Sequence, residues 1–175
     1  MTREDLFDVL RPLVLGTGVP EVVLYDEDAD SPPGEYASIE PFRTTDSRGQ
    51  GGLTLSDLSA GNLNATVRRV LEVTSEINFY RGSDPQAFAQ ALIGINEIPD
   101  ISATLFKNGV RWVGAGPARD LTGILGGGFR NEKRARIEIR LMLENKVSAE
   151  VPAILSDGGL KVDDESGRVL IDQEE

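Results

Sequence analysis

The region from Phe129 to Glu144 shows the clearest hydrophobic pattern in the chain. From Ala135 onward every second residue is apolar, and the residues between them are nearly all charged. The apolar positions are Ala135, Ile137, Ile139, Leu141 and Leu143, and the intervening positions are Arg134, Arg136, Glu138, Arg140, Met142 and Glu144. Strict alternation is typical of a strand with one face on a core and one face in water. The region therefore predicts a strand longer than the usual length of about five or six residues.

A second long strand is predicted over residues 63–80, where the same pattern recurs. The apolar residues are Leu71, Val73, Ile77 and Phe79, opposed by Glu72, Thr74, Glu76 and Asn78. Two long strands that each have one apolar face can share a single core. We expect them to belong to the same sheet.

Apolar residues at spacings of three and four predict helices elsewhere in the chain. Thr2 precedes such a pattern over 3–14, and its side-chain oxygen is suited to cap that helix. Ser83-Asp84-Pro85 is a typical helix start, and this helix should end before Pro99. A third, short helix is expected over 101–106.

Shorter apolar runs predict strands over 19–26, 35–42 and 110–113. Together the elements indicate an α+β fold: an antiparallel, long-stranded β-sheet with two or three α-helices packed on one face. Residues 1–155 are expected to form a single domain.

Three segments lack a clear core-forming pattern. Residues 43–62 are rich in Gly, Ser, Thr and Asp, which predicts a long flexible loop or an extended hairpin arm. Residues 147–155 are expected to pair back on the long strand at a sheet edge, because Pro152 cannot donate a ladder hydrogen bond. Residues 156–175 are acidic and read as a loosely ordered tail that contains a weak hairpin around 164–167.

Composition narrows the classes of function. The 175 residues include no cysteine and no histidine, and the formal net charge is −11. These absences exclude disulfides, zinc–thiolate sites and histidine-based catalytic triads. An acidic chain repels nucleic-acid phosphates, which disfavours sequence-independent DNA or RNA binding outside a local basic patch. No apolar run approaches the length of a membrane span, and the first residues lack the apolar core of a signal peptide.

Two ligand-binding motifs begin in this sequence without being completed. Residues 26–30 carry aspartates at the spacing that opens an EF-hand loop, but Ser31 and Ala37 replace the glycine and the glutamate that the loop requires. The glycines of 114–116 lack the remaining residues of either a dinucleotide fingerprint or a P-loop. We therefore expect no catalytic residue, no cofactor and no metal. A small enzyme that uses a pair of carboxylates is the alternative from a different class.

A more informative motif runs over residues 113–141, VGAGPARDLTGILGGGFRNEKRARIEIRL. It contains Gly116-Pro117, then Asp120-Leu121-Thr122, then Phe129 and Arg134-Ala135 at the start of the alternating strand. With the order of predicted elements, this segment resembles the neck and tail terminator proteins of long-tailed bacteriophages over roughly residues 3–155. Two departures are Glu132, displaced by one or two places, and the unusual GGG lead-in.

The resemblance implies a structural virion protein that assembles as a hexameric ring at the phage neck. Such a ring terminates the tail tube or sheath, joins the tail to the head–tail connector or head-closure protein, and leaves a channel for DNA. It also implies assembly in the host cytoplasm, and the family supplies no catalytic residues. Another head–tail joining or tail completion protein of similar build is the alternative.

The most basic feature of the chain is the row Lys133, Arg134, Arg136 and Arg140, which is a candidate contact with a neighbouring subunit or the tail. The row could instead face DNA in the channel or remain a solvated strand face. The net charge favours a protein contact, with DNA passing through the channel without specific binding. Residues 129–155 and the 43–62 loop are expected to reach neighbouring subunits or the tail tube. The loop and the acidic tail are expected to become ordered only on assembly.

Overall fold

A computed structural model describes residues 1–25, 30–57, 62–124, 131–152, 161–162 and 169–170. The chain divides into two compact units. The first comprises Met1–Gly51 and Arg69–Asn145, and the second comprises Gly52–Arg68 and Lys146–Glu175. Asp26 and Asp28, which begin the aspartate motif, lie outside the described residues.

The described helices all belong to the first unit, and the strands are divided between the two units. The helices are α1 (Arg3–Leu15), α2 (Pro85–Ile95) and α3 (Pro99–Lys107). None of these described helices is long and apolar enough to cross a lipid bilayer. The short strands of the first unit are β1 (Val22–Leu24), β4 (Val110–Ala115), β5 (Arg119–Asp120), β6 (Gly123–Ile124) and β7 (Asn131–Glu132). The long strands β2 (Tyr36–Asp57), β3 (Asn62–Tyr80) and β8 (Arg134–Pro152) run through both units, and the second also contains β9 (Lys161–Val162) and β10 (Val169–Leu170).

The main sheet has six strands in the order β1-β2-β3-β8-β4, with β5 also paired to β8. β1 is parallel to β2, whereas β4 and β5 are antiparallel to β8. Side-chain contacts show that the three long strands alternate in direction, since partner numbers fall on one strand as they rise on the next. The contact pairs are Pro41–Ser75 and Arg48–Glu72 between β2 and β3, and Asn78–Arg134 and Thr66–Ser148 between β3 and β8. The predicted α+β class with a long-stranded, mostly antiparallel sheet is confirmed.

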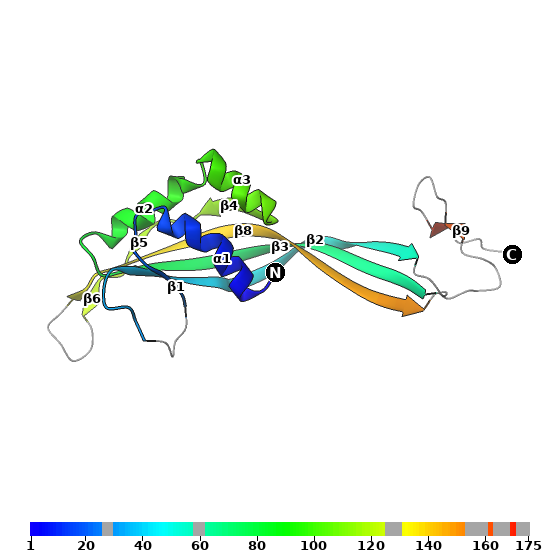
Figure 1. Ribbon diagram of the computed structural model, residues 1–175, viewed down its shortest axis with the longest axis horizontal. Coiled ribbons are helices and arrows are strands. Elements are labelled where there is room, and N and C mark those ends of the chain that lie inside the picture. The colour runs from blue at the N-terminus through cyan, green and yellow to red at the C-terminus, as the bar shows by residue number, and fades with distance from the viewer. Residues whose placement is uncertain (26–29, 58–61, 125–130, 153–160, 163–168, 171–175) are drawn as a thin grey trace. The chain divides into compact units, whose positions relative to one another are not determined.

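The core of the first unit lies between one face of the sheet and the three helices. Figure 1 shows α1, α2 and α3 along the same side of the sheet. On β8 the predicted apolar row, Ala135, Ile137, Ile139, Leu141 and Leu143, is buried against this layer. The helices contribute Leu6, Leu10, Leu13, Val14, Ala89, Leu92, Ile95 and Leu105. Burying a side chain of this kind stabilises the fold by about 1.5–3 kcal/mol, so these alternating positions decide which face packs.

The predicted helix boundaries rest on local hydrogen bonds. Thr2 accepts from the backbone of Asp5, whose carboxylate accepts from the backbone of Thr2, which makes a capping box for α1. Asp84 caps α2, and Pro85 takes the first helical position, where no amide donor is needed. Gly109, with φ +72°, follows α3 in a conformation that favours glycine.

Of the two alternatives predicted for residues 43–62, the extended hairpin arm matches the structure and the flexible loop was wrong over 43–57. Residues 43–57 form the second part of β2, and β3 already begins at Asn62. Residues 58–61 lie outside the described residues. Pairing with β3 satisfies the backbone groups on one edge of this segment, so it needs no alternating side chains to be a strand. The expectation that the whole loop orders only on assembly therefore does not hold for 43–57.

The hairpin predicted for residues 147–155 was also wrong in the part that is described. Residues 147–152 do not turn back but continue β8 to Pro152, and 153–155 lie outside the described residues. At the other end, β8 begins at Arg134, whereas Asn131–Glu132 form β7 and pair with β6. Residues 129 and 130 are likewise outside the described ranges. In the acidic segment, β9 and β10 pair antiparallel, as expected for the strands of the predicted weak hairpin, whereas residues 164–167 themselves lie outside the described residues.

Candidate functional site: an arginine–glutamate ladder

The sheet face opposite the helices carries a set of charged residues on its three long strands. Side chains alternate between faces along a strand, so residues four apart point the same way. Glu72 and Glu76 on the central strand β3 have this spacing, as do Arg136 and Arg140 on β8. We call the ladder the six residues Arg43 and Arg48 of β2, Glu72 and Glu76 of β3, and Arg136 and Arg140 of β8.

The first rung is centred on Glu76. Its Oε2 atom lies 2.6 Å from Nη1 of Arg43 and 3.4 Å from Nη1 of Arg136. These contacts are ionic, because no donor reaches Oε2 with hydrogen-bond geometry. Its Oε1 atom accepts a hydrogen bond of 2.9 Å from Nδ2 of Asn78. The carboxylate is nearly covered, with a side chain only 5% exposed. A charge this buried requires partners, and arginines from both flanking strands provide them.

The second rung is centred on Glu72. Its Oε2 atom accepts a hydrogen bond of 2.7 Å from Nε of Arg48, and its Oε1 atom lies 3.9 Å from Nη1 of Arg140. The hydrogen bond to Glu72, followed by the charge of that carboxylate, raises the pKa of Arg48. Each rung thus repeats one pattern: an arginine of β2, a glutamate of β3 and an arginine of β8.

The arginines of the ladder are more exposed than its carboxylates. Side-chain exposure is 42% for Arg43, 55% for Arg48 and 56% for Arg140, against 13% for Glu72. Arg136 is intermediate at 23%. In the first rung, Arg43 also pairs with Glu40 at 3.3 Å and Arg136 also pairs with Glu138 at 3.7 Å, so its positive charge is balanced. The second rung combines two guanidinium groups with one carboxylate, so it carries one excess positive charge although the chain as a whole is acidic.

Arg134, from the predicted basic row, lies on the same face in an aromatic setting. Its guanidinium is 4.9 Å from the centre of the Tyr80 ring, and its Nη2 atom donates to Oδ1 of Asn78 at 2.9 Å. Tyr80 stacks on Tyr36 with ring centres 4.6 Å apart. The guanidinium of Arg81 lies 5.6 Å from the centre of the Tyr36 ring. Burial raises the pKa of Tyr80, which keeps its hydroxyl protonated. In this cluster Tyr36 and Asn78 are buried, and Tyr80, Arg81 and Arg134 are half-buried.

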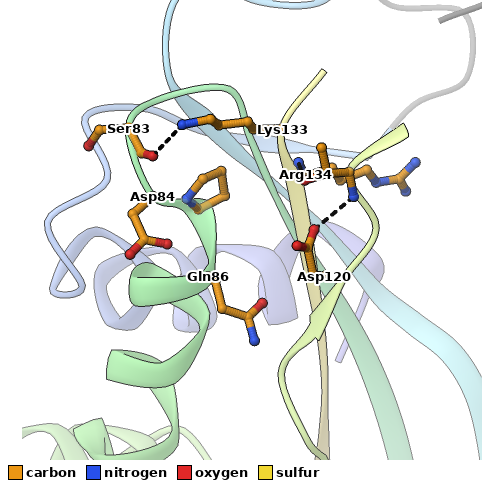
Figure 2. Close-up of a pocket in the computed structure, with 8 residues that line it drawn as sticks. Ser83, Asp84, Gln86, Asp120, Lys133 and Arg134 are labelled. Atoms are coloured by element: carbon orange, nitrogen blue, oxygen red, sulfur yellow. Dashed lines mark hydrogen bonds between the residues drawn. The ribbon is translucent and has the colours of Figure 1, made fainter. Parts of the chain in front are cut away.

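Lys133, the remaining residue of the predicted row, belongs to a different site. Its Nζ donates a hydrogen bond of 2.7 Å to the carbonyl oxygen of Ser83. Figure 2 shows it reaching across a hollow of about 290 Å³ that Asp84, Gln86 and Asp120 also line. Arg134 also lines this hollow, so two carboxylates balance two cations and the hollow has no excess charge of one sign. The four predicted residues therefore do not form one continuous row.

The motif that carries the family resemblance fixes the start of β8. The Gly116 amide donates to the Glu138 carbonyl at 2.7 Å, and the Leu121 amide donates to the Arg134 carbonyl at 2.8 Å. The Thr122 hydroxyl accepts from the Arg134 amide at 3.3 Å. The hydroxyl and the backbone amide of Thr122 donate hydrogen bonds to the carboxylate of Asp120, which hold the pKa of Asp120 below its usual value. The motif is thus a structural anchor for the strand that carries Arg136 and Arg140.

Sequence reasoning found four of the six ladder residues. The alternation placed Arg134, Arg136 and Arg140 on a wet face, and placed Glu72 and Glu76 on the wet face of the other long strand. It missed Arg43 and Arg48, because both fell in the segment predicted as a loop. The one available signal was the presence of Arg43 and Arg48 after the predicted strand, but no alternation of apolar residues accompanies them.

The comparison with protein families matches the model described as phage neck terminator protein over residues 4–165. The chain belongs to the phage neck terminator family. This family is structural, so the protein is a component of the virion neck that interacts with other head or tail proteins. A comparison with curated proteins finds no match. The ladder lies within the matched range.

Proposed function

We propose that this neck protein forms a closed homo-oligomeric ring, a hexamer, that terminates the tail tube or sheath. The ring joins the tail to the head–tail connector or head-closure protein and leaves a channel for DNA. The protein acts by binding and positioning its neighbours, without catalysis, and assembles in the host cytoplasm.

The observation that carries this proposal is an uncovered apolar face in the second unit. There β3 and β8 have apolar residues at odd positions, and the 2.9 Å contact between Thr66 and Ser148 puts even positions on the other face. Leu53, Leu55 and Val147 of this unit are 62%, 42% and 58% exposed. None of the described helices lies in the second unit. A small sheet with exposed apolar residues is typical of a surface that a partner covers.

The strand edges in the same unit support a head-to-tail contact. β1 pairs with β2 only over 37–39, and β4 and β5 pair with β8 only over 135–143. In the second unit, the described parts of β2 and β8 therefore have no partner strand but β3. One copy thus offers two different open edges. Contacts between unlike surfaces generate rings when the rotation closes, and open edges are suited to strand addition.

The arginines of β8 supply the second contact surface in this proposal. Arg134, Arg136 and Arg140 face a neighbouring subunit or the tail, and Lys133 contributes from the edge of this surface. The net charge of −11 disfavours tight phosphate binding along the channel, so DNA passes without specific binding.

Localisation in the particle tests the function directly. Antibody labelling combined with cryo-imaging should place the protein at the head–tail junction, as ring-shaped density at the end of the tail tube. A label at the distal end of the tail would support a tail completion role and contradict the proposal. Absence from the particle would contradict any structural role in the virion.

A matched pair of variants tests the apolar face. Leu55→Glu places a charge on the apolar side, and we expect particles with tails of uncontrolled length or unjoined heads. Thr54→Glu, at the adjacent position, adds the same charge on the opposite side of the strand and should leave assembly intact. Equal assembly by both variants would show that the apolar face is not a contact surface.

A further inference from the structure

We propose that the second rung of the ladder, formed by Arg48, Glu72 and Arg140, binds a carboxylate of a neighbouring copy of this chain, so that this rung is one half of an ionic subunit contact. This inference rests on the ring proposed above and names the partner's chemistry at the arginine surface.

The second rung has more donor capacity than Glu72 can use. A guanidinium group has five N–H donors arranged to hold a carboxylate through two of them. In the second rung, Arg48 uses its Nε for Glu72, and Arg140 lies 3.9 Å from the same carboxylate, beyond hydrogen-bond distance. One further carboxylate above the rung would balance its charge and accept from both arginines.

The glutamates hold the arginines in place before a partner arrives. The side chains of Glu72 and Glu76 are 13% and 5% exposed, and each contacts one arginine of β2 and one arginine of β8. An arginine that is already oriented loses less rotamer freedom when it binds. Glu72 and Glu76 are therefore positioning residues for the surface arginines.

The charge distribution favours a second copy as the partner. The second rung has two arginines and one glutamate, a net charge of +1. Subtracting these from 18 basic and 29 acidic residues leaves 16 and 28, so the rest of the chain carries −12. An approaching copy therefore presents a predominantly acidic surface. On β3 and β8 the two rungs are four residues, or about 13 Å, apart, so the second rung is a separate site for one carboxylate.

DNA fits the ladder less well than carboxylates do. Duplex DNA presents a phosphate charge about every 1.7 Å along its axis, far closer than the spacing of the rungs. Between the two rungs, Glu138 on β8 is 42% exposed, and at the ladder's margin Glu40 on β2 is 30% exposed. A continuous row of phosphates would meet these acids, whereas side-chain carboxylates can be placed to avoid them.

Self-association of the full-length protein, measured by sedimentation equilibrium, tests the inference. We expect Arg140→Gln to weaken self-association by about tenfold or more. A hydrogen bond to a charged group contributes more free energy than the amount that corresponds to a tenfold change in affinity. Arg140→Lys keeps the charge but loses the planar fork, so it should show an intermediate loss. Arg11→Gln removes the same charge from an exposed position on α1 and should change association less than threefold. Raising the salt concentration from 0.1 M to 0.5 M should weaken the self-association of the unmodified protein more than it weakens the self-association of the Arg140→Gln variant.

Three results would overturn the inference: no self-association of the unmodified protein, equal association of Arg140→Gln and Arg11→Gln, or Arg140-dependent binding to a labelled DNA duplex without an effect on self-association. Thermal unfolding of each variant confirms that the fold is kept, as expected for a side chain that is 56% exposed. The labelling experiment separates the two proposals. A protein located at the neck whose association ignores Arg140 keeps the proposed function and loses this inference. If self-association depends on Arg140 but the protein is absent from the neck, this inference is kept and the proposed function is lost.

Discussion

Glu76 of β3 and Arg43 of β2 form the shortest ion pair of the ladder, with Oε2 and Nη1 2.6 Å apart. The carboxylate is nearly buried, while the arginine is 42% exposed. The pair therefore joins the interior of the sheet to its surface. Because Arg136 contacts the same oxygen from the other side, one carboxylate links three strands.

Removing the central charge should destabilise the sheet. We expect Glu76→Gln to lower the free energy of unfolding by about 1–3 kcal/mol, because the arginines lose their shared charged acceptor. The measurement is urea denaturation of the full-length protein. Glu138→Gln, on the same face but 42% exposed, is the control and should change stability by less than about 0.5 kcal/mol. Equal effects of the two substitutions would mean that burial of Glu76 adds nothing.

The apolar row of β8 should behave as core only where the helices cover it. Ile139→Ala should cost about 2–5 kcal/mol, because Ile139 is 1% exposed and its removal leaves a cavity. Val147→Ala tests the same strand at a side chain that is 58% exposed, and should change the stability of the free protein by less than about 0.5 kcal/mol. Thermal or urea unfolding measures both. A large loss for Val147→Ala would show that its face is already covered in the free protein.

The capping box of α1 should make stability depend on pH. Hydrogen bonds from Thr2 hold the pKa of Asp5 below its usual value of 3.8. A carboxyl group with a lowered folded pKa contributes stability above its unfolded pKa, and this contribution is lost as the pH falls through the folded pKa. Asp5→Asn should therefore be less stable than the parent at pH 7, and the difference should disappear at about pH 2. Urea unfolding at both pH values measures this, and Asp8→Asn controls for the loss of one charge on the same helix. A difference that persists at low pH would assign the effect to packing.

Two glycines should respond in opposite directions to the same substitution. Gly109 has φ +72°, and no atom lies within 4 Å of the position of an added Cβ. Gly109→Ala should thus cost about 1–2 kcal/mol through backbone conformation alone. Gly94 in α2 also has open space at its Cβ position but has no positive φ. Gly94→Ala should stabilise by up to about 1 kcal/mol, because alanine is the better helix former. Denaturant titration compares the two variants, and a matching sign would refute the argument.

Much of the first unit could be predicted from local patterns. The alternation of Ile137, Ile139 and Leu141 identified a strand and its buried face, and Thr2 and Asp84 marked helix starts. The predicted strand ends were wrong at 43–57 and 147–152, because backbone pairing between strands extends β2 and β8 beyond the part that the side-chain pattern identifies. Of the candidate site, Arg136 and Arg140 were found, while Arg43 and Arg48 were hidden in a segment without periodicity.

The sequence by itself determined which side of each long strand faces the core, because a period of two follows from the geometry of a single extended chain. It also determined the excess of acidic residues and the motif that leads into β8. Only the tertiary structure decided which glutamate meets which arginine, and that Lys133 turns to Ser83 and not toward Arg136. Those contacts depend on the register between strands far apart in the chain, and register is set by the packing of the whole sheet. The ladder therefore exists only once β2, β3 and β8 are side by side.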